Sequence, residues 1–119
     1  MVLADTSVWI QHFRHGEPRL AGLLSEGLVL IHPFIVGELA CGSLKDRATV
    51  LAWLGQLPQA TPATSTEALS FLEERRLWGR GLGWTDVHLL ASANLAGCAF
   101  WTLDRRLTQA AKDLRIPTF

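Results

Sequence analysis

The stretch VLADTSVWI, residues 2–10, places a carboxylate inside the first apolar run of the chain. The residues VLA at 2–4 predict a short buried strand, and the apolar residues after Ser7 predict a helix. We expect Thr6 or Ser7 to cap that helix. Because a buried, unpaired carboxylate is costly, Asp5 is either a turn residue or a group with a positive partner.

Apolar strands and helices alternate along the rest of the sequence. Two more strands are predicted at 28–32 (LVLIH) and 98–103 (CAFWTL), with weaker ones at 60–63 and 116–119. This alternation is typical of βαβ units, and it predicts a parallel sheet that is covered by helices on both faces. Since there is no repeat, linker or low-complexity segment, we expect a single domain over residues 1–119.

Start and stop signals define the helices between these strands. Pro18 is predicted to begin one helix, and Gly42 to end another that carries Glu38. Thr64 and Glu67 form a capping box. Thr85 is predicted to cap the helix DVHLLASANLA, which follows the glycine loop GRGLG.

Composition limits the class of protein. The chain has 119 residues, 49% of them hydrophobic, and a formal net charge of zero. No apolar run approaches the ~20 residues of a membrane span, and no basic segment precedes the first apolar run as in a signal peptide. We therefore expect a cytoplasmic protein without membrane contact, with Cys41 and Cys98 as reduced core residues.

Four carboxylates stand where the predicted fold would gather them. Asp5 and Asp104 each end an apolar strand, and in open α/β sheets functional groups lie at the carboxyl ends of strands. Asp86 is near the N-terminus of the helix that leads into 98–103, and Glu38 interrupts the apolar helix FIVGELACG. If the strands at 2–4 and 98–103 are neighbours, all four side chains share one edge of the sheet.

Each acid also has an ordinary interpretation. Asp5, Asp86 and Asp104 are all placed to cap or begin a helix, and Glu38 is placed to reach solvent. Taken together, four carboxylates in one cleft would repel one another and raise their pKa values. A hard divalent cation removes that repulsion, and carboxylate oxygens suit Mg²⁺ or Mn²⁺.

These positions resemble the PIN-domain ribonucleases, and in particular the VapC-type toxins of bacterial toxin–antitoxin systems. The similarity rests on VLADTSVWI, GELACG, GWTDVHLLASANLAG and WTLDRRL, in this order over nearly the whole chain. It implies a three-layer α/β/α fold with a central parallel sheet. Asp5, Glu38, Asp86 and Asp104 match the four acids that bind the metal. Thr6, Ser7 and Thr102 match the supporting hydroxyl residues.

The resemblance also implies an activity and partners. It implies a magnesium- or manganese-dependent endoribonuclease that cleaves RNA, of the tRNA or ribosomal RNA class, forms a homodimer and is inhibited by a cognate antitoxin. Asp5 and Asp104 are then the primary metal ligands. Asp86 completes the shell or holds a bound water, and Glu38 acts as a ligand through water or as a general base. Some members have a further acid where this chain has Arg105, so one or two metal ions remain open.

Setting the four acids aside leaves seven acids against eleven Lys and Arg, a net of +4 that suits an RNA-binding surface. We predict phosphate contacts for Arg80, Arg105 and Arg106, and base stacking for Trp84.

Three alternatives stay open. A metal-independent ribonuclease could use a histidine pair such as His12 and His88. An aspartate phosphorylation switch or aspartyl phosphatase would also place Asp5 after its first strand, but position 7 is Ser where such phosphatases have a second Asp. The third alternative is a catalytically silent PIN-like module that binds RNA or protein.

Overall fold

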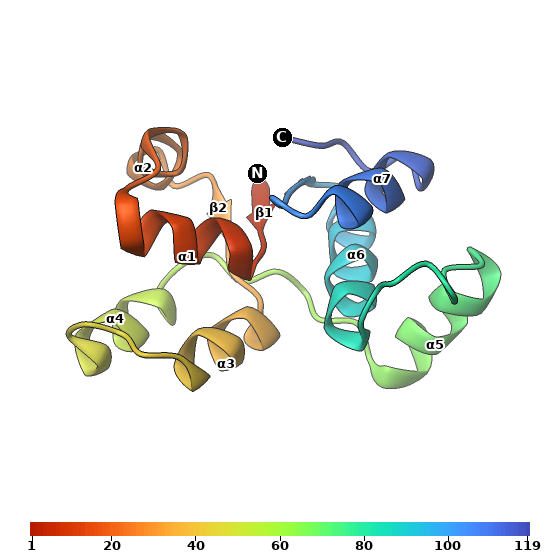
Figure 1. Cartoon of the computed structure of the whole chain (residues 1–119), viewed down its shortest axis with the longest axis horizontal. Helices are drawn as coiled ribbons and strands as arrows, with labels where there is room; N and C mark the ends of the chain where they lie inside the picture. Colours follow the sequence, from red (N-terminus) through yellow and green to blue (C-terminus); the bar gives the residue numbers. More distant parts are fainter.

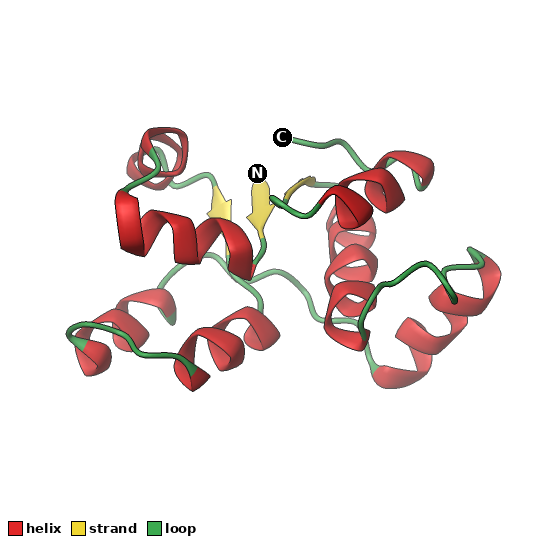
Figure 2. Cartoon of the chain, viewed as in Figure 1, coloured by secondary structure: helices red, strands yellow, loops and turns green.

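The three main predicted strands form one parallel sheet at the centre of the molecule. The computed structural model describes residues 1–119. β1 (Val2–Ala4) lies in the middle of the order β2-β1-β3 and pairs with both neighbours in parallel. β2 (Val29–Leu30) and β3 (Ala99–Trp101) are shorter than the predicted strands at 28–32 and 98–103, because their ends turn into the adjoining helices. Figure 2 shows these strands between two groups of helices.

Seven helices follow the strands in the predicted alternation. They are α1 (Thr6–His15), α2 (Pro18–Ser25), α3 (Pro33–Cys41), α4 (Arg47–Leu54), α5 (Ser65–Glu74), α6 (Trp84–Ala96) and α7 (Arg105–Asp113). The β1–β2 and β2–β3 connections cross the sheet in opposite directions, so right-handed crossovers place α1 and α2 on one face and α6 on the other. Figure 1 shows α1 to α4 on one side of the strands and α5 to α7 on the other. This is the PIN-like α/β fold that the resemblance predicts.

The core is apolar and continuous across the sheet. It is one cluster of 25 buried residues that joins the strands to α1, α3, α6 and α7. Trp9, Phe100 and Leu90 are among its fully buried side chains. We propose that residues 1–119 form a single domain, because the hydrophobic core is continuous. No helix is long and apolar enough to span a membrane.

Several local predictions were wrong. Residues 60–63 form no strand, since one isolated bridge between Ile31 and Gln59 is the only pairing in that region. The segment 116–119 does pair in parallel with the edge strand β3, as predicted, but only through a single bridge between Phe100 and Thr118. Cys98 is buried and free as predicted, but Cys41 is exposed at the end of α3.

Two predicted helix caps were also wrong. Asp5, rather than Thr6 or Ser7, is the N-cap of α1. Helix α6 begins at Trp84 and has Gly83 as its N-cap, so Thr85 lies inside the first turn. Asp86 replaces the missing side-chain cap by accepting a hydrogen bond from the Gly83 backbone N–H, at 2.9 Å.

Candidate metal centre and active site

Asp5 is a buried carboxylate at the junction of β1 and α1. Only 7% of the surface of Asp5 is exposed to solvent. Oδ1 accepts hydrogen bonds from the Ser7 hydroxyl at 2.5 Å and from the Val8 backbone N–H at 3.3 Å. Burial raises the pKa of Asp5, while the hydrogen bonds to Ser7, Thr102 and Val8 oppose that shift. The carboxylate is therefore held by neutral donors and has no basic partner.

Two hydroxyls tie Asp5 to the loop after β3. Thr102 Oγ1 donates to Asp5 Oδ2 at 2.5 Å and accepts from the Asp104 backbone N–H at 3.1 Å. Ser7 Oγ, which donates to Asp5, accepts from the Leu103 backbone N–H at 3.0 Å. Each hydroxyl thus donates its single proton to Asp5. These contacts fix the ends of β1 and β3 relative to each other.

Glu38 is linked to the same place from α3. Thr6 Oγ1 donates to Glu38 Oε1 at 2.6 Å, across the contact between α1 and α3. Glu38 is exposed, and Oε2 makes no hydrogen bond within the chain. The predicted supporting residue Thr6 therefore holds Glu38, while Ser7 and Thr102 hold Asp5.

Asp86 and Asp104 approach from the other helices. Asp86 Oδ2 accepts from Gly83, and Asp104 Oδ1 caps α7 by accepting from the backbone N–H groups of Arg106 and Leu107, at 2.8 and 3.2 Å. Burial is the first cause of the raised pKa of Asp86, and the negative charges of Asp104 and Glu38 raise it further. Asp86 therefore has two negatively charged neighbours and no positively charged one.

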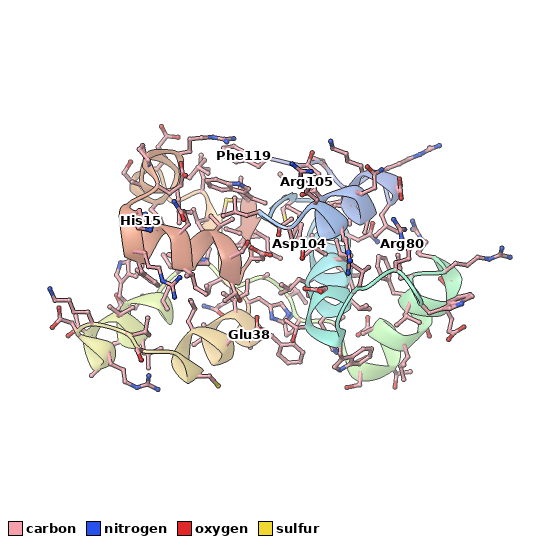
Figure 3. All side chains as sticks on the ribbon, viewed as in Figure 1. His15, Glu38, Arg80, Asp104, Arg105 and Phe119 are labelled. Carbon is pink, nitrogen blue, oxygen red and sulfur yellow. The ribbon has the colours of Figure 1, made fainter.

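Three of the four acids lie at the start of a helix. Asp5 and Asp104 are N-caps, and Asp86 lies in the first turn of α6. The positive ends of the helix dipoles favour carboxylates there. Figure 3 shows Glu38 and Asp104 on opposite sides of the space between the two groups of helices.

The donor set fits a hard divalent cation in its chemistry. The one salt bridge of the chain joins Arg80 to Asp113. No Lys, Arg or His therefore lies within ion-pair distance of any of the four acids. Glu38, Asp86 and Asp104 each keep one carboxylate oxygen without a hydrogen bond in the chain. No group of three or more His, Cys, Asp or Glu side chains is drawn together as a formed metal site. A cation would therefore have to draw the exposed carboxylates inward.

The cavities lie beside this group rather than over it. One of about 120 Å³ has Glu38 at its margin and lies between α1 and the end of α3. Another, of about 270 Å³, lies between α5 and α6. Glu38 and Asp104 are thus exposed to solvent, Asp86 is partly exposed, and Asp5 is buried beneath them.

The predicted arginine contacts differ in their surroundings. Arg80 pairs with Asp113 on α7 at 2.7 Å. Arg105, in the first turn of α7, is exposed and lies on the Phe119 side of Asp104, away from Glu38 (Figure 3). The Arg106 side chain packs against Gly81 in the glycine loop.

A group of aromatic side chains lies between α3 and α6. The sequence prediction named only one of them, Trp84. Trp84 is 42% exposed and Phe34 37% exposed. Their rings pack on His88 from two directions, with centroid distances of 4.5 and 4.6 Å. Phe34 was missed, although it lies four residues before Glu38 and hence on the same face of α3.

Two histidines, His32 and His88, are buried. His88 is 2% exposed, and neither of its ring nitrogens has a hydrogen-bond partner. His32 caps α3 through Nδ1, which accepts from the Phe34 N–H at 2.9 Å. Burial, with the nearby His88, lowers the pKa of His32 to about 4.

The structure and sequence match known proteins over nearly the whole chain. A family model described as PIN domain matches residues 2–113. Ribonuclease VapC32 of Mycobacterium tuberculosis is 46% identical over 114 residues, which cover 95% of this chain and 92% of that protein.

Solved structures share the fold at low sequence identity. FitAB bound to a DNA fragment gives a TM-score of 0.68 at 15% identity and covers 100% of this chain and 94% of the other. FitAcB from Neisseria gonorrhoeae gives 0.67 at 18% identity, with 100% and 96% coverage. PAE2754 from Pyrobaculum aerophilum gives 0.63 at 19% identity, with 98% and 89% coverage.

The sheet order, the seven helices and these matches agree with one another. The chain belongs to the PIN-domain family and, within it, to the VapC-type ribonucleases.

Proposed function

We propose that this chain is a divalent-metal-dependent endoribonuclease and the toxin of a type II toxin–antitoxin pair. The observation that carries the proposal is the hydrogen-bonded link from Asp5 through Thr102 to Asp104 and from Thr6 to Glu38, with no protein cation within ion-pair distance of these acids or of Asp86. The identity with a ribonuclease of the VapC type supports RNA as the substrate.

The four acids are the proposed metal-binding and catalytic residues. Asp5 and Asp104 are the primary ligands of Mg²⁺ or Mn²⁺, with Asp86 as a further ligand or the holder of a bound water. When bound, the cation would lower the pKa of a water and neutralise charge on the phosphoryl oxygens. Glu38 is a ligand through water or a general base for the attacking water.

The residues around the acids set their positions. Ser7 and Thr102 direct their hydroxyl protons to Asp5 and leave it no freedom to rotate. Thr6 holds one oxygen of Glu38 and leaves the other free to take a proton. The Gly83 N–H orients Asp86 in the same way.

RNA contacts are proposed on both sides of the acids. Arg105 and Arg106 directly follow Asp104 and can contact backbone phosphates of RNA. Trp84, together with Phe34, offers an aromatic ring face on which an unpaired base can stack. Arg80 remains a predicted contact, although its pairing with Asp113 leaves it less available. An antitoxin partner and a homodimer, which the resemblance to VapC-type toxins implies, and a cytoplasmic location complete the proposal.

A histidine-based mechanism is the less favoured alternative. Both ring nitrogens of His88 are buried, so this residue has no path for exchanging a proton with a substrate. Metal-independent cleavage would also yield a cyclic phosphate, whereas attack by water yields 5′-phosphate and 3′-hydroxyl ends.

The test is RNA cleavage by protein freed of any antitoxin, with and without Mg²⁺ or Mn²⁺. Asp5→Asn, Glu38→Gln, Asp86→Asn and Asp104→Asn should each lower the rate on the order of 100-fold without unfolding the protein. Asp46→Asn is a matched control, because Asp46 is exposed and its side chain caps nothing. Glu26→Gln is the corresponding control for Glu38.

Three outcomes would overturn the proposal. Wild-type protein that binds no divalent cation by calorimetry would contradict the metal site. Cleavage that persists in chelator would point to the histidine mechanism. A protein that binds RNA with metal present but never cleaves it would be the silent binding module.

A further inference from the structure

Gly81 and Arg106 make an unusually close contact between the glycine loop and α7. A Cβ atom built on Gly81 would lie 2.6 Å from Arg106 Nη1, 3.2 Å from Cδ and 3.3 Å from Cζ. Any other side chain at position 81 would thus require the exposed Arg106 guanidinium to move away. Gly79 has almost the same backbone, with φ of +72° against +75°, but a Cβ there would meet nothing within 4 Å.

The guanidinium that rests on Gly81 has no acidic partner. No carboxylate lies within ion-pair distance of Arg106, and its side chain makes no hydrogen bond in the chain. Its backbone N–H donates to Asp104, and two residues after Gly81 the Gly83 N–H donates to Asp86. Arg106 therefore carries an unpaired positive charge in the first turn of α7, and this charge contacts the loop two residues before the start of α6.

The loop is tied to α7 at a second point. Arg80 Nη2 donates to Asp113 Oδ2 at 2.7 Å, and Gln109 holds the other oxygen of Asp113 at 2.9 Å. Gln109 lies four positions before Asp113, so its hydrogen bond to Asp113 spans one turn of α7. Arg80 thus links the loop to α7 at the residue that precedes Gly81.

We propose that Gly81 and Arg106 form a preset cradle for a backbone phosphate of RNA, with Arg106 as the ligand and Gly81 as the residue that positions it. The inference rests on the proposed function for its substrate and adds residue roles to it. A planar guanidinium offers several N–H donors in a fixed fork that matches a phosphate. Holding it on the loop in advance spares the ordering of a long side chain on binding.

The experiment measures binding of a short fluorescent single-stranded RNA in chelator, where no metal-dependent cleavage occurs, over a series of salt concentrations. Arg106→Ala should weaken binding roughly tenfold and lower the slope of log affinity against log salt by about 0.7. The cap on Asp104 survives this change because the backbone N–H supplies it.

Gly81→Ala and Gly79→Ala form a matched pair. Both introduce the same left-handed backbone strain and should lower the melting temperature equally. Only Gly81→Ala displaces Arg106, so it should reproduce most of the affinity loss and of the fall in salt slope, while Gly79→Ala should bind as wild type. In the Arg106→Ala background, adding Gly81→Ala should cause no further loss.

Three results would overturn the cradle. Equal binding by the two glycine variants would assign the effect to the backbone. A full additional loss in the double variant would show that Gly81 acts without Arg106. Unchanged RNA binding by Arg106→Ala would show that the guanidinium does not bind a phosphate of this RNA. Failure of the nuclease proposal is separate, since it is read from metal-dependent cleavage by the wild type.

Discussion

Thr102 Oγ1 donates a hydrogen bond to Asp5 Oδ2 at 2.5 Å, across 97 positions of the sequence. The same hydroxyl accepts from the Asp104 N–H, so one side chain orients two of the four proposed metal ligands. The parallel pairing of β1 with β3 makes this contact possible, because it brings the ends of both strands to one edge.

Thr102→Val should therefore lower both stability and metal affinity, although the two side chains are almost the same size. The change leaves one oxygen of Asp5 without its donor and the Asp104 N–H without its acceptor. We expect a loss of stability of roughly 1–3 kcal/mol, the usual cost of an unsatisfied buried group, and weaker metal binding. Thr108→Val on α7 is the control, since its hydroxyl meets only the Asp104 carbonyl. Equal metal affinity in the two variants by calorimetry would contradict the prediction.

Asp86→Asn should stabilise the metal-free protein while removing activity. The raised pKa of Asp86 means that the folded state holds its proton more tightly than the unfolded chain does. Its contribution to stability is therefore complete below the ordinary pKa of 3.8 and is lost as pH rises through the raised value. The neutral amide keeps the Gly83 hydrogen bond and escapes repulsion by Asp104 and Glu38.

Thermal melting in chelator tests this prediction. The variant should melt a few degrees above wild type at neutral pH, and the gap should close at low pH. Adding Mg²⁺ or Mn²⁺ should raise the melting temperature of wild type more than that of the variant, because ligand binding stabilises the folded state. A variant that is less stable than wild type in chelator would show that the carboxylate is not under strain there.

Mild acid should destabilise the protein through His32. The folded pKa of about 4 is below the ordinary 6.5, so stability falls as pH drops from 6.5 toward 4. A shift of this size corresponds to about 3 kcal/mol as an upper limit. His32→Asn retains a side-chain acceptor for the start of α3 and should flatten the pH dependence.

Urea unfolding between neutral pH and pH 4 measures the effect of His32. His88 has a pKa lowered by burial and contributes in the same direction, so some pH dependence should remain in the variant. An unchanged slope in His32→Asn would exclude His32 as the cause.

Trp84→Ala should weaken RNA binding more than Trp78→Ala. Trp84 packs edge-on against His88, which fixes its ring beside the acids, whereas Trp78 is 55% exposed and has no aromatic neighbour. Loss of one base-stacking ring costs roughly 1–3 kcal/mol in binding. Fluorescence titration with single-stranded RNA in chelator provides the measurement, and equal losses in the two variants would count against stacking at Trp84.

Local sequence signals were sufficient for most elements. The apolar run at 2–4, Pro18, the Thr64–Glu67 capping box and Gly97 mark their strands and helix ends, because each acts on its own stretch of backbone. The weak strand at 60–63 was predicted wrongly for the same reason. Its apolar residues are buried against the core, but no strand partner runs along them.

The sequence by itself determined that Asp5, Asp86 and Asp104 stand at the starts of helices, since capping depends on neighbours within a few residues. Only the tertiary structure decided that these helices begin at one edge of a parallel sheet and that Glu38 reaches them through Thr6. It also decided the roles of the arginines: Arg80 is paired and Arg106 is free. Contacts between residues that are far apart in sequence depend on sheet order and helix packing, which no local pattern encodes.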